Sequence, residues 1–137
     1  MNQEFDLAAM THTDCGLPNI PREDEIIKLK WLWFNFVLPM KKYIGEITIT
    51  SAFRSDAVNK HVGGVPTSQH RLAEAIDFIP KEVKFEDAFS WCKSSLEFGQ
   101  LIIERSGDKR WIHISRPRVG KPNMQALRME NGKYFLA

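Results

Sequence analysis

Two histidines and one aspartate have the residue types of a catalytic metal site. His70 and Asp77 bracket a short stretch that runs into the apolar segment 75–79, and His113 lies far downstream between two isoleucines. Catalytic zinc sites use three protein ligands and leave one position open for water. The spacing by itself is a weak pattern, since a solitary histidine is more often a solvated residue. The hypothesis therefore requires that the fold brings the three side chains together.

A carboxylate beside such a site could serve as the general base. Glu104 ends one predicted strand of a hairpin and would pair near Arg110 or Trp111. If it pairs with Trp111, it shares a face with Trp111 and His113, because side chains alternate along a strand. A slip of one residue would place it on the other face. Glu104 is our first choice for the base and Asp108 our second.

Four further residues are candidates for contact with the substrate. Arg54, at the end of the first predicted strand, could hold a carboxylate through two parallel hydrogen bonds, with a surface salt bridge as the alternative. Ser68 and Gln69, just ahead of His70, could form hydrogen bonds with substrate or cap a turn. Trp111, expected on the same face of the sheet as His113, could pack against substrate or shield the metal.

Apolar periodicity predicts the elements that must position these residues. A helix is expected from about Pro21 to Lys42, with Pro39 kinking or breaking its last turns. A second helix is expected over 85–97, and Ser55 is a plausible N-cap for a short helical turn. The predicted strands are 47–51, 75–79, 100–104 and 110–115, and a hairpin loop spans 105–109. This order indicates an α+β fold, with a small, mostly antiparallel sheet that carries the zinc site and packs against two main helices.

The chain length favours a single domain over residues 1–137. Within it we expect an irregular lead-in over 1–22 and a basic C-terminal tail over 117–137. In that tail, two short apolar runs around Asn131-Gly132 could form a last hairpin.

Composition excludes few classes of protein but favours an ordinary soluble domain. The hydrophobic fraction is 43% and the charged fraction 26%. A net charge of +2 is weak support for a polyanion partner, so no nucleic acid is expected. Cys15 and Cys92 are too few for a disulfide framework, although one bridge between them stays open.

The N-terminal residues lack the pattern of a secretory signal, which favours a protein made in the cytoplasm with free thiols. The most apolar run, 31–40, is too short to span a bilayer, which needs about 20 residues. We expect no membrane span and a monomer.

Taken together, the motifs resemble the zinc D-Ala-D-Ala carboxypeptidase and L-alanyl-D-glutamate peptidase family of peptidoglycan metallopeptidases, in particular its small phage-associated branch. The similarity covers about residues 20–116. It rests on the stretches Ile49-Thr50-Ser51-Ala52-Phe53-Arg54-Ser55, Val58-Asn59-x-x-Val62-Gly63-Gly64, Ser68-x-His70-x-x-Ala73-x-Ala75-x-Asp77, Gln100-Leu101-Ile102-x-Glu104 and Trp111-Ile112-His113-Ile114-Ser115.

The resemblance implies zinc held by His70, Asp77 and His113. It also implies that Arg54 binds a substrate carboxylate or carbonyl, with Ser68 close by.

The chain departs from the family's pattern at several positions. The family often has glycine where this chain has Ala73, and Gly-Tyr at 52–53. Several relatives place their acidic base three residues before the last histidine, where this chain has Arg110. The base must then come from elsewhere, and Glu104 fits the hairpin argument.

The expected function is that of a zinc metallopeptidase, either a DD-carboxypeptidase or an endopeptidase. It would hydrolyse a bond next to a D-amino acid in peptidoglycan stem or cross-link peptides. A phage-like origin, as an endolysin, would explain an enzyme without a leader that acts on the cell wall.

Two alternatives remain. One is a non-catalytic zinc-containing module that binds the cell wall. The other is an interaction protein that uses the basic tail, through Arg116, Arg118, Lys121 and Arg128.

Overall fold

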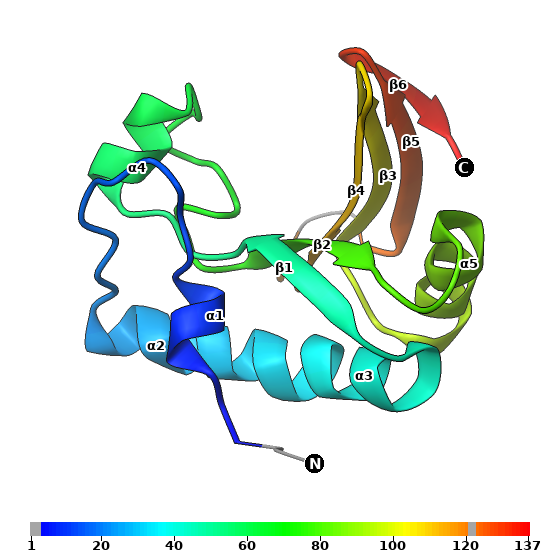
Figure 1. Ribbon diagram of the computed structural model, residues 1–137, viewed down its shortest axis with the longest axis horizontal. Coiled ribbons are helices and arrows are strands. Elements are labelled where there is room, and N and C mark those ends of the chain that lie inside the picture. The colour runs from blue at the N-terminus through cyan, green and yellow to red at the C-terminus, as the bar shows by residue number, and fades with distance from the viewer. Residues whose placement is uncertain (1–3, 121–122) are drawn as a thin grey trace.

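A computed structural model describes residues 4–120 and 123–137 of the chain, so Lys121 lies outside the described residues. One long helical rod runs beneath a six-stranded sheet, and α5 covers part of the same side (Figure 1). The helices are α1 (Leu7–Met10), α2 (Glu23–Leu32), η1 (Trp33–Val37), α3 (Leu38–Ile44), α4 (Asp56–His61) and α5 (Phe85–Ser95). The strands are β1 (Ile47–Ser51), β2 (Ala75–Pro80), β3 (Gln100–Ser106), β4 (Lys109–Ser115), β5 (Gln125–Glu130) and β6 (Lys133–Leu136).

The sheet has the order β1-β2-β4-β3-β5-β6. Every neighbouring pair is antiparallel except β3 and β5, which run parallel. The fold is therefore α+β with a mostly antiparallel sheet, as the order of predicted elements indicated.

The rod consists of α2, η1 and α3 and corresponds to the helix predicted over 21–42. The chain does not break at Pro39. Instead a π-helical turn precedes it, in which the Leu38 N–H bonds to the Trp33 carbonyl five residues back. The wider π-helical turn accommodates Pro39, which has no backbone N–H to donate. Gly45 ends the rod with a φ of 87°, a backbone conformation that glycine adopts without strain.

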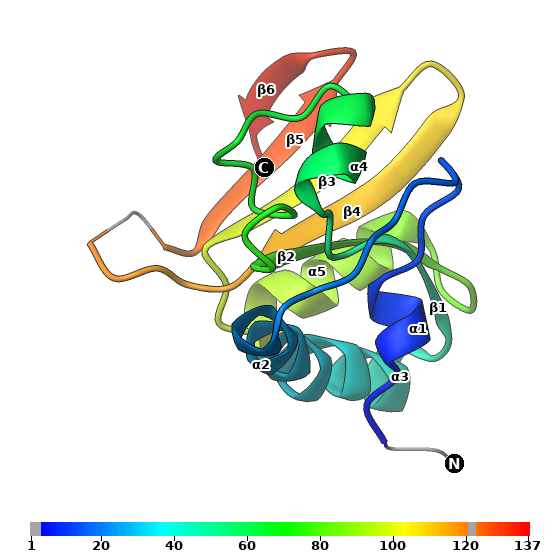
Figure 2. The same ribbon diagram turned by 90° about the vertical axis from the view of Figure 1, so that its left-hand side faces the viewer.

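The core lies between the rod, α5 and one face of the sheet. The buried sheet residues on this face are Ile76, Phe78, Leu101, Ile103, Ile112 and Ile114. Side chains alternate along a strand, so the residues between them point to the opposite face. This second face of the sheet is turned toward α4 (Figure 2). It carries the polar residues that are candidates for metal binding and catalysis.

Each chain end contains one feature that the sequence did not indicate. The lead-in includes α1, where the Asp6 side chain accepts a hydrogen bond from the Ala9 N–H at 3.0 Å. The tail forms the β5–β6 hairpin expected around Asn131-Gly132, whose φ angles are 49° and 84°. The parallel pairing of β5 with β3, which the sequence did not predict, attaches this hairpin to the main sheet.

Cys15 and Cys92 are both free thiols, so no disulfide bridge joins them. No helix among the described residues is long and apolar enough to cross a membrane.

Candidate metal site and active-site pocket

The fold brings together His70, Asp77 and His113. Asp77 on β2 is directly opposite His113 on β4 in the antiparallel ladder, and His70 lies in the turn that leads into β2. All three side chains are buried, and one potential ligand atom from each lies within 4.8 Å of the others. The same Asp77 oxygen, Oδ1, is 3.2 Å from His70 Nε2 and 2.9 Å from His113 Nδ1.

These residues fit a zinc ion. Zinc bonds of about 2.0–2.1 Å in tetrahedral geometry place neighbouring ligand atoms roughly 3.3 Å apart. The two distances to Asp77 Oδ1, 3.2 and 2.9 Å, are close to that spacing. Two imidazoles and one carboxylate are also a donor set that catalytic zinc sites use.

Hydrogen bonds on the far side of each imidazole fix which nitrogen faces the centre. His70 Nδ1 lies 2.8 Å from the Ala52 carbonyl oxygen, so it carries the proton and leaves Nε2 free. His113 Nε2 lies 2.6 Å from Gln69 Oε1, so it donates to the amide and leaves Nδ1 free. Such outer contacts orient metal-binding histidines and make them more basic.

The Asp77 side chain is held in its ionised form. Burial raises the pKa of this carboxyl group. When His70 and His113 are protonated, their charges and hydrogen bonds outweigh burial and bring the pKa below its ordinary value. An ionised carboxylate is the form that binds a metal.

Glu104 lies on the same face of the sheet, in the register that places it opposite Trp111. The Trp111 indole Nε1 donates a hydrogen bond to Glu104 Oε2 at 2.9 Å. Burial raises the pKa of Glu104 above its ordinary value, with Asp77 adding to the rise and His113 and the indole bond opposing it. A carboxylate with a raised pKa is a better proton acceptor near neutral pH.

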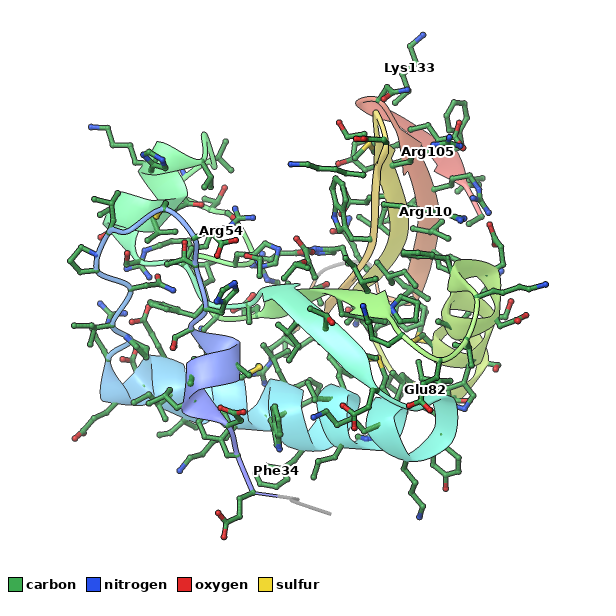
Figure 3. The ribbon with its side chains drawn as sticks, in the orientation of Figure 1. Phe34, Arg54, Glu82, Arg105, Arg110 and Lys133 are labelled. Carbon is green, nitrogen blue, oxygen red and sulfur yellow. The ribbon has the colours of Figure 1, made fainter. Side chains whose placement is uncertain are left out.

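Arg54 lies on the α4 side of this face (Figure 3). Its Nε donates to Ser51 Oγ at 3.3 Å and its Nη1 to Asn59 Oδ1 at 3.5 Å. Burial lowers the pKa of Arg54, while the charges of Asp77 and Glu104 raise it, so the guanidinium is within electrostatic range of both carboxylates.

One pocket of about 450 Å³ joins these groups. The three metal-site residues line it together with Arg54, Ser68, Glu104 and Trp111. Asp108 does not line it, because this residue lies in the exposed β3–β4 turn. The structure thus brings together every candidate residue except Asp108.

The pocket also contains residues that the sequence did not single out for this role, among them Gln100 and Tyr134. Tyr134 on β6 pairs with Met129 on β5, which pairs with Glu104 on β3. These three residues and Trp111 therefore form one row across the sheet. No local signal in the sequence identifies Tyr134, because its position depends on the parallel β3–β5 pairing.

Two departures from the family's pattern have structural explanations. Ala73 has a φ of 59°, a left-handed conformation that glycine adopts freely and that costs other residues about 1–2 kcal/mol. The Arg110 side chain lies over the Phe85 ring at 4.7 Å and pairs with Glu86 at 3.1 Å, both at α5. Position 110 therefore points away from the metal face and does not contribute to the pocket.

Comparison with known proteins gives one family. The family model described as Peptidase M15 matches residues 6–115, which include the three metal-site residues and end at the last residue of β4. No curated protein matches the chain at a significant level. Because that match spans most of the sequence, this chain belongs to the peptidase M15 family of zinc D-Ala-D-Ala carboxypeptidase-like peptidoglycan metallopeptidases.

Proposed function

We propose that this protein is a zinc-dependent peptidase that hydrolyses a bond next to a D-amino acid in peptidoglycan stem or cross-link peptides. The observation that carries the proposal is that Glu104 shares one pocket with the buried group of His70, Asp77 and His113. Membership of the M15 family supports a zinc peptidase that acts on peptidoglycan. Action on the cell wall, as a carboxypeptidase or as a phage-type endolysin, is part of the proposal.

His70 Nε2, Asp77 Oδ1 and His113 Nδ1 would hold the zinc ion. Bound there, zinc would supply a Lewis acid for the scissile carbonyl and lower the pKa of water. Asp77 contributes a negative charge, which favours retention of a divalent cation in a buried site. Ala52 and Gln69 keep the two imidazoles in the tautomers that this arrangement requires.

Glu104 acts as the general base. The indole of Trp111 occupies Oε2, which leaves Oε1 to accept the proton of the attacking water. The protonated carboxyl group then gives that proton to the leaving amine, so one residue serves both steps. The raised pKa of Glu104 suits both roles, because the group must gain and lose a proton within one turnover.

Arg54 and Tyr134 both line the pocket and would contact the substrate. Arg54 is pre-positioned by Ser51 and Asn59, and its guanidinium suits a peptide carbonyl or carboxylate. Tyr134 offers an aromatic ring that is 60% exposed and a hydroxyl group at the edge of the pocket. An extended peptide between them would have its scissile carbonyl near the metal site.

The test is incubation of purified muropeptides with zinc-loaded protein, with the products identified by mass. The masses of the fragments, which together exceed the starting muropeptide by one water for each broken bond, identify the cleaved bond. They also separate carboxypeptidase from endopeptidase action. Intact muropeptides after incubation with fully zinc-loaded protein would contradict the proposal.

One observation supports the alternative, in which the protein is a zinc-containing module that binds the cell wall without catalysis. Position 110, where several relatives have an acidic base, carries an arginine. Such a module would bind wall fragments and zinc without changing the mass of any muropeptide.

A further inference from the structure

A second, smaller pocket opens beside the metal site. It has a volume of about 230 Å³ and shares Gln69 and Gln100 with the active-site pocket. Two arginines, a glycine and several neutral polar residues line it, namely Arg116, Arg118, Gly99, Ser115, Asn123, Gln125 and the two shared glutamines. Among the described residues, no aspartate, glutamate or large apolar side chain contributes to its lining.

The positive charge in this pocket is not fully neutralised. The Arg116 guanidinium lies 4.7 Å over the Trp31 ring, and no described carboxylate forms an ion pair with it. Arg118 Nε donates to Glu74, while Arg118 Nη2 is buried and has no hydrogen-bond partner among the described residues. Buried donors without partners are rare in native proteins, and this guanidinium therefore retains one donor that no described acceptor satisfies.

The single negative charge of Glu74 does not neutralise the positive charges of both arginines. It also accepts a hydrogen bond from Lys28 Nζ at 3.2 Å, so one carboxylate is shared between two cations. Counting Lys28, Arg116 and Arg118 against Glu74 leaves an excess of positive charge at this end of the face. Excess positive charge around polar amides favours an anionic ligand group.

A chain of amides connects this pocket to the metal site. Gln69 accepts a hydrogen bond from His113 Nε2 and donates to Gln100 Oε1 at 3.2 Å. Gln100 in turn donates to Gln125 Oε1 at 2.9 Å. The pocket therefore begins one side chain beyond His113. An extended peptide advances about 3.3 Å per residue, so a group one or two residues from the scissile bond would reach it.

We propose that the pocket of Arg116 and Arg118 is a subsite for a carboxylate of the substrate peptide, one or two residues from the cleaved bond. The proposal rests on the peptidase function above and specifies its substrate as an anionic peptide. A guanidinium matches a carboxylate through paired N–H donors. The carboxylate belongs either to an acidic residue within the peptide or to the peptide's C-terminus, and these sources require different substrates.

The experiment measures binding without turnover. Zinc-loaded Glu104→Gln protein is titrated by calorimetry with a pentapeptide that contains one glutamate and ends in D-Ala-D-Ala. Four forms are compared, in which the glutamate carboxyl and the C-terminal carboxyl are each either free or amidated. One of the two free acids should bind about ten- to a hundredfold more tightly than its matched amide, which is typical of hydrogen bonds to charged groups. The position that shows the preference identifies the source of the carboxylate.

Arginine variants in the same background test the assignment. Arg116→Gln and Arg118→Gln should remove most of the preference for the acid and leave amide binding unchanged. Arg128→Gln is the matched control, since Arg128 pairs with Glu86 near α5 and lines neither pocket. It should retain the preference. If Arg118→Gln weakens binding of acid and amide alike, through loss of its pair with Glu74, then Arg116→Gln, which breaks no ion pair, decides the question.

Equal binding of acids and amides by the zinc-loaded protein would overturn the subsite, as would a preference that survives both arginine variants. These results are independent of peptidase activity. If the protein prefers the acid but cleaves no muropeptide, the subsite stands and the proposed peptidase function fails. If the protein cleaves muropeptides but shows no preference for the acid, the peptidase function stands and the subsite fails.

Discussion

The Trp111 indole donates a hydrogen bond to Glu104 across the β3–β4 ladder, with 2.9 Å between Nε1 and Oε2. This contact holds the carboxylate on the metal face beside His113 and leaves the second oxygen of Glu104 for water. It also lowers the pKa of Glu104 against the larger effect of burial. Trp111 thus positions the proposed base and also lines the pocket that we propose for the substrate.

Replacement of the proposed base should stop turnover without removing the metal. Glu104→Gln is expected to lower kcat by about 10²–10⁴-fold, the usual contribution of a general base, with the zinc content unchanged. Asp108→Asn is the control, because Asp108 lies in the exposed β3–β4 turn. Equal losses in the two variants, or full activity in Glu104→Gln, would contradict the assignment. A wall-binding module would show no turnover to lose.

Removal of the indole bond should change the pH dependence of catalysis. Trp111→Phe deletes a contact that lowers the pKa of Glu104, so the pKa should rise. Because the base must be ionised to accept a proton, the acidic limb of the kcat/KM profile should move to higher pH. The profile of Asp108→Asn provides the reference. An acidic limb that stays in place or moves to lower pH would show that Glu104 does not control it.

Loss of the β4 histidine should abolish zinc binding and turnover together. His113→Ala removes one of three proposed ligands and leaves Asp77 with His70 alone. The zinc content of purified protein can be measured by mass spectrometry, beside peptide hydrolysis. His61→Ala is the control, since His61 ends α4 and lies outside the metal group. Full activity in His113→Ala would refute the metal site.

The amide that accepts from His113 should affect zinc affinity. Gln69→Ala removes the acceptor for His113 Nε2, and loss of such an outer contact typically costs about 10–100-fold in metal affinity. Competition with a fluorescent zinc chelator measures the change. Gln125→Ala, at the far end of the amide chain and without contact to His113, should bind zinc almost as the unmutated protein does. Equal zinc affinity in both variants would contradict the positioning role.

The hairpin beyond the family match should contribute to substrate binding. Tyr134→Ala is expected to raise KM by about three- to tenfold, which corresponds to the loss of a partly buried aromatic contact of roughly 1 kcal/mol, with zinc content unchanged. Phe135→Ala is the control, because neighbouring side chains on a strand point to opposite faces and Phe135 does not line the pocket. A KM that is unaffected by Tyr134→Ala would exclude this wall from the substrate site.

Local patterns predicted most of the elements. The bounds of β1 agree with the prediction, and Ser55 caps the short helix α4, as expected, by accepting from the Val58 N–H at 3.2 Å. Capping and side-chain alternation depend on residues a few positions apart, so the sequence carries them directly. The β3–β4 loop was predicted too long, since the ladder continues to Ser106 and Lys109 around a two-residue turn. Gly107, with a φ of 62°, permits that tight turn.

The sequence by itself determined which side chains could bind zinc and which carboxylate could share their face. It left open whether Glu104 pairs with Trp111, because a slip of one residue satisfies the same local pattern. Only the tertiary structure decided that register and the adjacency of β2 and β4, which places Asp77 opposite His113. It likewise decided the parallel pairing of β5 with β3 that brings Tyr134 to the pocket. These contacts join residues far apart in the chain, and they are fixed by the packing of whole strands and helices, which no short window of sequence encodes.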